Sequence, residues 1–453
     1  IDRQDLNALS LHSKLISKDA GLLQMSLLRF QDFLSGLVKR QRGVFAKSES
    51  ESVEDLVDKL MGSVGEVSGI VTARQVLDRY SDLNSDDKLA FFHHLEKNFN
   101  ANEDYIQKAF TNYIGQPSSS TLSTLSKAAE PLRQELLRRL NQTPGATHDL
   151  VAMRSNLLSF LKKNPSLSAV DEDFQRLFAS WFGRGFLQLQ TIDWSTSAAI
   201  LERIIRYEAV HAIKDWDDLR NRIEPPNRRC FAFFHPALID EPLIFVEVAL
   251  THGIPKSIDA ILNEAATEPE SYNNNDTAVF YSISNCQPGL HNISFGNLLI
   301  KQVVQELQAE FPSIKTFVTL SPVPGFSRWL KSDDSVLTAE LNELKQDVAK
   351  LSLTDAADEA HQGNIRKLVV NYLVLSKTRN KPSDPVARFH LGNGATLHEV
   401  NAGADLSDNG MKQSRGTMVN YLYDLSSIES NHEQFALEGT VSFHSKLKPL
   451  LLN

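Results

Sequence analysis

The sequence predicts a two-domain protein, with an all-helical domain over residues 1–182 and a mixed α/β domain over residues 183–453. The chain of 453 residues is too long for one ordinary hydrophobic core, so two or more domains are expected. Only 4 of its 17 prolines fall in the first 182 residues, where apolar residues recur with helical spacing. From about residue 183, short aromatic and β-branched runs alternate with helical patterns, which predicts the domain boundary.

The first domain is expected to hold about seven or eight helices, given the usual length of a helix. An apolar stripe of helical period runs through "LLQMSLLRFQDFLSGL" (22–37). A second helix is predicted to start after Ser52, because Asp55 follows at the spacing of a capping box. "DDKLAFFHHLEKNF" (86–99) and "PLRQELLRRL" (131–140) predict two further amphipathic helices.

The second domain is expected to alternate strands and helices. Aromatic and β-branched runs predict strands at 229–236, 242–253, 277–284 and 314–320. Helical patterns predict helices at 294–311, 337–352 and 363–376. "VARFHLGNGATLHEV" (386–400) and "TMVNYLYDL" (417–425) are also strand-like. The order of these elements over 277–320 predicts a strand–loop–helix–strand unit.

Composition excludes several classes of protein. A net charge of −9 argues against nonspecific binding to nucleic acid. No apolar run reaches the roughly 20 residues of a membrane span, and the strongest candidate, 242–250, contains Glu247. Two cysteines, Cys230 and Cys286, cannot form a disulfide framework, which suits a reducing compartment. We therefore expect a cytoplasmic protein, although the missing initiator methionine allows for a trimmed organellar leader.

The loop "NCQPGLHNISFGN" (285–297) joins a predicted strand to a predicted helix. Gly289 and Gly296 permit close backbone approach, and a helix start favours a phosphate. The alternative is an ordinary helix entrance capped by Ser294, because isolated glycines are a weak signal. If the loop does hold a phosphate, Lys412 and Arg415 are candidates to assist it.

Ser321 follows the predicted strand 314–320 directly, in "TLSPVPGFSRWL". One interpretation is that Ser321 caps a helix whose first residue is Pro322. The other is a functional serine, because Pro322 and Pro324 stiffen the loop and ligands often bind at strand ends.

His390 lies in "ARFHLGNGA" (387–395), where strand alternation would place it opposite Phe389 and Leu391. A lone strand histidine is commonly a hydrogen-bonded core residue, yet the turn signal at 393–394 puts His390 near a strand end. No histidine spacing of the HExxH type predicts a metal site.

Four stretches together resemble the malonyl-CoA decarboxylase family. They are "FYSISNCQPGLHNISFGNLLIKQVVQELQAEFP", "TLSPVPGFSRWL", "FHLGNGATLHEVNAGADLS" and "MVNYLYDL", in the family's order and at compatible separations. The resemblance covers most of residues 205–425. It implies an N-terminal helical oligomerisation domain and a catalytic domain that resembles the Gcn5-related acetyltransferase fold. It also implies a homotetramer or homodimer built through residues 1–182.

By position, the resemblance implies that Ser321 and His390 are catalytic. It also implies an acyl-CoA-binding set, which comprises Gln287, Gly289, His291, Asn292, Ile293, Ser294, Phe295, Gly296, Asn297, Asn420 and Tyr423. Two positions depart from the family pattern, with Asn292 in place of glycine and Ser294 in place of an acidic residue. Asparagine tolerates a left-handed backbone better than most residues do.

The implied reaction converts malonyl-CoA to acetyl-CoA and CO₂ without a separate cofactor or metal, because the thioester carbonyl takes up the electrons. The implied roles are that Ser321 holds the malonyl carboxylate and His390 supplies a proton. An acyltransferase would need an acceptor site and a base for an amine, neither of which is identifiable. A thioesterase is also open, although "TLSPVPG" is not a G-x-S-x-G elbow. A non-catalytic scaffold would have no need of both Ser321 and His390.

Overall fold

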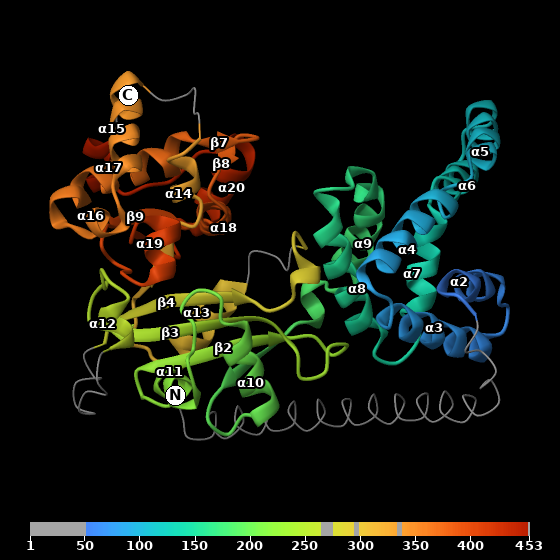
Figure 1. Cartoon of the computed structure of the whole chain (residues 1–453), viewed down its shortest axis with the longest axis horizontal. Coiled ribbons are helices and arrows are strands. Elements are labelled where there is room, and N and C mark those ends of the chain that lie inside the picture. The colour runs from blue at the N-terminus through green and yellow to red at the C-terminus, as the bar shows by residue number, and fades with distance from the viewer. Residues whose placement is uncertain (1–50, 264–274, 294–298, 333–337, 452–453) are drawn as a thin grey trace, which may run out of the picture. The chain divides into compact units, whose positions relative to one another are not determined.

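The computed structural model describes residues 51–263, 275–293, 299–332 and 338–451. These residues divide into two compact units (Figure 1). The first contains the described residues up to Trp181 together with Pro288–Ile293, and the second contains the rest. The predicted fold class, helical first and mixed α/β second, is confirmed. The predicted apolar stripe at 22–37 lies outside the described residues.

The first unit is built from helices throughout its described part. Its α-helices are α2 (Val53–Gly62), α3 (Glu66–Ser81), α4 (Ser85–Asn98), α5 (Glu103–Gly115), α6 (Ser119–Ala128), α7 (Leu132–Leu140), α8 (Ala146–Leu161) and α9 (Ser168–Trp181). A short 3₁₀ helix, η1 (Pro165–Leu167), separates the last two. Ser52 and Asp55 form the predicted capping box at the start of α2. Buried aromatic rings, including Phe91, Phe92 and Phe174, fill the core.

The second unit is organised around a sheet of eight described strands. The strands are β1 (Gln188–Ile192), β2 (Arg228–Phe234), β3 (Pro242–Thr251), β4 (Thr277–Asn285), β5 (Thr316–Thr319), β6 (Ser321–Pro322), β9 (Thr396–Asn401) and β10 (Met418–Leu422). Their order is β1-β2-β3-β4-β5-β10-β6, and β9 pairs with β10. The strands predicted at 229–236, 242–253, 277–284 and 314–320 are confirmed as β2 to β5.

One pair of strands in this sheet, β4 and β5, is parallel, whereas its other paired strands run antiparallel. A parallel pair needs a long crossover connection, which here contains α13 (Leu299–Glu310). Strand β10 then pairs with both β5 and β6. The sheet therefore places the end of β5, and Ser321 beyond it, against a strand about 100 residues later in the chain.

The second unit contains further helices besides α13. They are α10 (Ala198–Tyr207), α11 (Trp216–Ile223), α12 (Asp259–Leu262), α14 (Phe326–Trp329), α15 (Ala339–Lys350), α16 (Leu353–Ala357), α17 (Glu359–Leu375), α18 (Pro385–Gly392), α19 (Asp408–Ser414) and α20 (Ile428–Glu438). Short 3₁₀ helices are η2 (Arg184–Phe186), η4 (Pro288–Leu290), which belongs to the first unit, and η5 (Ser445–Leu450). A small hairpin, β7 (Lys377–Thr378) with β8 (Lys381–Pro382), precedes α18.

The predicted strand at 386–400 is wrong in its first half and right in its second. Residues Pro385–Gly392 form α18, and only Thr396–Asn401 form a strand. Asp384 caps this helix and Pro385 is at its first position, a combination that starts helices. The apparent alternation around His390 was therefore part of a helical pattern.

Candidate active site

Ser321 and His390 meet inside the second unit. The Oγ of Ser321 lies 3.0 Å from the Nε2 of His390, although 69 residues separate them in the chain. Both side chains are buried, with exposed fractions of 6% and 3%. A serine hydroxyl and an imidazole at hydrogen-bond distance can share a proton, so the structure brings together the two residues predicted to be catalytic.

A hydrogen-bonded chain extends this pair on both sides. Ser321 Oγ donates to Thr319 Oγ1 at 3.0 Å, and the hydroxyl of Tyr423 lies 2.8 Å from His390 Nδ1. One proton arrangement satisfies these contacts together. Because Ser321 donates to Thr319, His390 donates from Nε2 to Ser321, and Nδ1 then accepts from Tyr423. The imidazole proton therefore points at Ser321.

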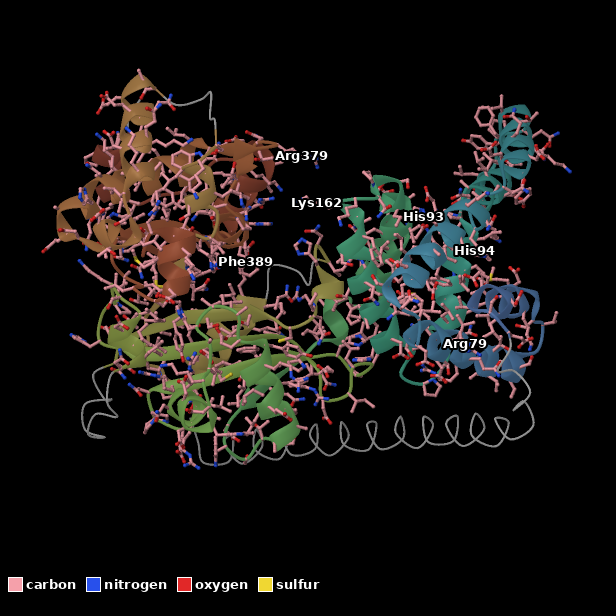
Figure 2. The ribbon with its side chains drawn as sticks, in the orientation of Figure 1. Arg79, His93, His94, Lys162, Arg379 and Phe389 are labelled. Carbon is pink, nitrogen blue, oxygen red and sulfur yellow. The ribbon has the colours of Figure 1, made fainter. Side chains whose placement is uncertain are left out.

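Aromatic rings hold the imidazole in place. The ring of Tyr421 stacks on His390 with centroids 4.7 Å apart and an interplanar angle of 24°. Phe389, whose side chain is labelled in Figure 2, packs edge-on against His390 and is 42% exposed. Phe389 thus marks the outer surface of α18 beside the buried pair.

Ser321 is a strand residue and not a helix cap, which corrects one of the two interpretations from the sequence. It pairs with Val419 across the β6–β10 ladder, and Pro322 pairs with Met418. The next helix, α14, starts only at Phe326 after Gly325. The proline in β6 donates no hydrogen bond, which agrees with the place of β6 at the edge of the sheet.

Asp384 connects the segment after Ser321 to the helix that carries His390. Its Oδ1 accepts the N–H groups of Val386 and Ala387 at 2.9 and 3.0 Å, which caps α18. Its Oδ2 accepts the N–H of Gly325 at 3.0 Å. A Cβ on Gly325 would come within 2.2 Å of the Tyr372 hydroxyl, so the chain needs glycine there.

Burial dominates the electrostatics of the site. It lowers the pKa of His390 from the ordinary 6.5 to about 3, because no opposite charge compensates for the lost water. It raises the pKa of the phenols of Tyr421 and Tyr423 well above 10, and that of the Asp384 carboxyl above 3.8. At neutral pH the imidazole and both phenols are therefore uncharged.

Of the other predicted site residues, Tyr423 contacts His390 directly. Asn420 contacts Thr319, the residue that accepts the hydrogen bond of Ser321. Asn420 is completely buried, and its Nδ2 donates to the carbonyls of Thr319 and Pro255 at 3.0 and 3.3 Å. Its Oδ1 accepts from Asn401 Nδ2 at 2.6 Å. Asn420 therefore fixes the strands beneath Thr319, with its amide hydrogen bonds already used within the protein.

The predicted binding loop is only partly described, since Ser294, Phe295, Gly296 and Asn297 lie outside the described residues. Gln287 donates to the carbonyl of Pro242 at 3.1 Å. Asn292 has a φ of 63°, in the left-handed region that asparagine tolerates, and Ile293 is buried.

Gly289 and the backbone of His291 have structural partners within the first unit. A Cβ on Gly289 would come within 1.9 Å of the carbonyl oxygen of Val151 in α8. Arg154, which is fully buried against Asp171, donates to the carbonyls of Gly289 and His291 at 2.7 and 2.9 Å. Packing therefore explains the need for glycine at position 289 without any ligand.

Lys412 and Arg415, the candidates for phosphate contacts, differ from each other. Lys412 is exposed on α19. Arg415 ends that helix in a left-handed conformation at φ 53°, and its Nη1 donates to the carbonyl of Leu351 at 3.0 Å. Its guanidinium is thus partly engaged in holding α19.

Three residues of the site were missed from the sequence: Thr319, Tyr421 and Asp384. The Asp384–Pro385 pair is a recognisable helix start and could have been found. Thr319 and Tyr421 look like ordinary strand residues, and only the pairing of β5 with β10 brings them to His390.

Among the described residues, no group of three or more histidine, cysteine, aspartate or glutamate side chains has the geometry to hold a metal ion. No helix in the described part of the chain has the length and apolar character needed to cross a membrane.

Comparison with known protein families gives matches across most of the chain. The malonyl-CoA decarboxylase C-terminal domain matches residues 185–453, and the malonyl-CoA decarboxylase N-terminal domain matches residues 99–182. The mitochondrial malonyl-CoA decarboxylase of Anser anser anser is 34% identical over 355 residues, which cover 70% of each chain. The Mus musculus protein of the same name is 35% identical over 337 residues, 68% of each chain.

Solved structures agree with these matches. A malonyl-CoA decarboxylase from Rhodopseudomonas palustris superposes with a TM-score of 0.82 at 48% identity, over 88% of this chain and all of that one. The enzyme from Agrobacterium vitis gives a TM-score of 0.80 at 47% identity, with the same coverage. That from Cupriavidus metallidurans gives 0.68 at 33% identity, over 91% of this chain and 99% of the other.

Proposed function

The chain belongs to the malonyl-CoA decarboxylase family, and we propose that Ser321 and His390 carry out the decarboxylation of malonyl-CoA in it. The observation that carries this assignment is the 3.0 Å contact between two buried side chains that can transfer a proton. The remaining geometry gives each residue a distinct part in the reaction.

The reaction needs an oriented carboxylate and a place for negative charge. The bond between the malonyl carboxylate and the α-carbon breaks, CO₂ leaves, and the electron pair passes to the thioester as an enolate. A proton then adds to the α-carbon to give acetyl-CoA. Cleavage is easiest when the bond stands perpendicular to the thioester plane, so a residue that holds the carboxylate in that position lowers the barrier.

Ser321 is suited to hold the carboxylate. Its hydroxyl donates to Thr319, and it can turn to donate to a carboxylate oxygen, which is the stronger acceptor. The pairing of β6 with β10 and the prolines that follow fix its backbone. No covalent bond from the serine is required.

His390 is suited to supply the proton. Burial keeps it neutral, because it lowers the pKa to about 3. An arriving carboxylate within about 4–6 Å favours the charged imidazolium and so raises the pKa. The proton on Nε2 points toward Ser321, and therefore toward the group that Ser321 holds. Tyr423 keeps Nδ1 occupied, which fixes this tautomer.

The same contacts disfavour a thioesterase of the serine-triad type. In such a triad a carboxylate orients the histidine, whereas here the partner of His390 Nδ1 is the phenol of Tyr423.

We further propose that the 287–297 loop and the start of α13 bind the CoA phosphates. The support is the place of this loop between β4 and α13, because a helix start favours a phosphate.

Product analysis tests the assignment. Incubation with malonyl-CoA should yield acetyl-CoA and CO₂ in equal amounts, resolved by chromatography. Free CoA and malonate would instead indicate a thioesterase, and acetylation of a model amine by acetyl-CoA would indicate an acyltransferase. Ser321→Ala that decarboxylates at the parental rate would remove the serine from the mechanism.

Assembly and location complete the proposal. We propose a homo-oligomer, a tetramer or dimer, built through the helical domain. The support comes from α5 and α6, which pack on each other and leave Tyr105, Phe110, Ile114 and Leu122 between 46% and 61% exposed. We also propose a cytoplasmic location, supported by two cysteines that are buried and free.

A further inference from the structure

A hollow of about 240 Å³ lies between α17 and β9 of the second unit, two elements labelled in Figure 1. The polar side chains that line it are Lys256, Gln362, Arg366, Glu399 and Asn401. A water molecule takes about 30 Å³ of liquid, so the hollow has room for an oxyanion of several heavy atoms together with ordered water.

Positive charge exceeds negative charge around this hollow. Lys446 Nζ lies 2.9 Å from Glu399 Oε2 and forms a close ion pair with it. The other oxygen, Oε1, is 3.6 Å from Lys256 Nζ and 3.8 Å from Arg366 Nη2. Three cations thus share one carboxylate, which leaves two positive charges uncompensated in a chain whose net charge is −9.

Three of the side chains at the hollow also have donor capacity to spare. Apart from the ion pairs of Lys256 and Arg366 with Glu399, the side chains of Lys256, Arg366 and Gln362 form no hydrogen bond with any part of the chain that the structure describes. The Nε of Arg366 is buried without an acceptor there, although its side chain as a whole is 38% exposed. A covered guanidinium N–H without a partner costs free energy, which a bound acceptor would recover.

We propose that this hollow binds a phosphate-type oxyanion, held by Lys256 and Arg366 with the amide of Gln362 beside them. Arginine and lysine complement such an anion differently. The planar guanidinium gives paired, directional N–H donors, whereas the ammonium acts as a point charge. Glu399 Oε1 lies near both cations while Oε2 is paired with Lys446, so an oxyanion can bind the two cations without displacing Glu399 from either.

The position of the hollow separates this anion from the reacting carbon. Val400 pairs with Val419, which pairs with Ser321, so two strand spacings or about 10 Å of sheet lie between β9 and β6. Glu399 and Asn401 alternate with Val400, and their side chains therefore leave the opposite face of β9 from that of Ser321. An oxyanion bound here would therefore anchor its ligand, and it would not be the carboxylate that reacts.

Two sources could supply this chemistry. One is a phosphate of coenzyme A, and this source rests on the proposed function. The other is free phosphate or a phosphate ester that binds independently of turnover. Both engage the same two cations, and the two are separable by experiment.

The test compares the double variant Lys256→Gln/Arg366→Gln with the parent and with Lys350→Gln, a control whose side chain is 74% exposed on α15. The melting temperature of each protein is measured at increasing concentrations of inorganic phosphate. Chloride at equal ionic strength is the reference. Phosphate should raise the melting temperature of the parent and the control with concentration, but not that of the double variant. This arm requires no turnover, so it stands even if the proposed function fails.

The second arm separates the sources. Malonyl-CoA and its 3′-dephospho form are used as substrates of all three proteins. If the 3′-phosphate of CoA is the ligand, the double variant raises KM for malonyl-CoA by about tenfold or more and leaves KM for the dephospho form unchanged. An unchanged KM for both substrates, with stabilisation by phosphate, identifies a free phosphate site. If phosphate stabilises all three proteins equally, or none, and KM is unchanged, the proposal is wrong.

Discussion

The carboxylate of Asp384 accepts the backbone N–H of Gly325 at 3.0 Å, and this contact joins the segment after Ser321 to the helix that carries His390. Gly325 lies four residues after Ser321, and Asp384 caps the helix in which His390 lies. The carboxylate is 1% exposed, so the contact is protected from water. The separation of Ser321 from His390 therefore depends on a residue that touches neither of them.

Replacing Asp384 tests this dependence. Asp384→Asn should keep one side-chain oxygen that can cap α18. It should weaken the hydrogen bond from the N–H of Gly325, because the amide nitrogen of asparagine is a donor and cannot accept it. We expect kcat to fall by about 10- to 100-fold, because small misplacements of catalytic groups are costly. KM should change little. Asp358→Asn, at the cap of α17, is the matched control and should leave kcat unchanged. Equal effects of the two variants on kcat would show that Asp384 is only a cap.

Ser321→Ala and His390→Asn should each reduce decarboxylation by about 10²–10⁴-fold. Because Ser321 does not cap a helix, its removal should cost no capping energy, in contrast to the expectation from the sequence. It should still destabilise the fold by about 1–3 kcal/mol, since the buried Nε2 of His390 loses its acceptor. Both variants should bind acetyl-CoA as the parent does, measured by calorimetry. Loss of binding along with turnover would indicate a collapsed site.

Tyr423→Phe and Tyr421→Phe form a matched pair. Both rings are buried beside His390, but only the Tyr423 hydroxyl contacts Nδ1, while that of Tyr421 has no partner among the described residues. Tyr423→Phe should lower kcat by about tenfold or more, because the imidazole loses the contact that fixes its tautomer. Tyr421→Phe should retain the parental kcat, since it keeps the stacked ring. A similar loss in both variants would assign the effect to packing.

The strands of the central sheet could be predicted because their residues are locally distinctive. Runs such as 229–236 and 242–253 are rich in aromatic and β-branched residues, and they correspond to β2 and β3. The local pattern around His390 is not distinctive enough to predict its secondary structure. Its neighbours Phe389 and Leu391 fit a strand or a helix equally well over so short a window, and the Asp384–Pro385 start decides in favour of the helix.

The pairing of Ser321 with His390 could be expected from family resemblance but not from local pattern. It requires β10 to pair with both β5 and β6, and α18 to pack beside them, which are contacts over about 70–100 residues of chain. Gly289 shows the opposite failure. Glycine in a loop suggested a ligand, whereas the structure gives packing on Val151 as a sufficient reason. A substitution at Gly289 would therefore disturb the fold and cannot report on CoA binding.

The exposed apolar side chains of α5 and α6 predict where copies of the chain associate. Only Ala109 is buried in α5 and only Ala128 in α6, while Phe110 and Ile114 are 48% and 61% exposed. Phe110→Glu/Ile114→Glu should shift the protein to a smaller species in sedimentation velocity at micromolar concentration. Leu437→Glu, at a position 84% exposed on α20, is the control and should not. A parent that sediments as a monomer would contradict the proposed oligomer.

The depressed pKa of His390 predicts how stability depends on pH. Its pKa is about 3 when folded and 6.5 ordinarily, so between these values the unfolded chain binds a proton that the folded chain does not. The free energy of unfolding therefore rises with pH in this window, by up to about 1.4 kcal/mol per pH unit for one full proton, and the dependence from this group ends above 6.5. Urea unfolding at pH 4.5, 5.5, 6.5 and 7.5 measures the slope.

His390→Asn should flatten this slope below pH 6.5, because asparagine carries no titrating proton in either state. Some slope should remain, since burial also lowers the pKa of His211 and that of His398, each to about 4. If His390→Asn gives the same slope as the parent, His390 is protonated in the folded protein. The statement that His390 is neutral in the folded protein would then be wrong. The proposal that the substrate carboxylate raises the pKa of His390, and so favours its protonation, would fail with it.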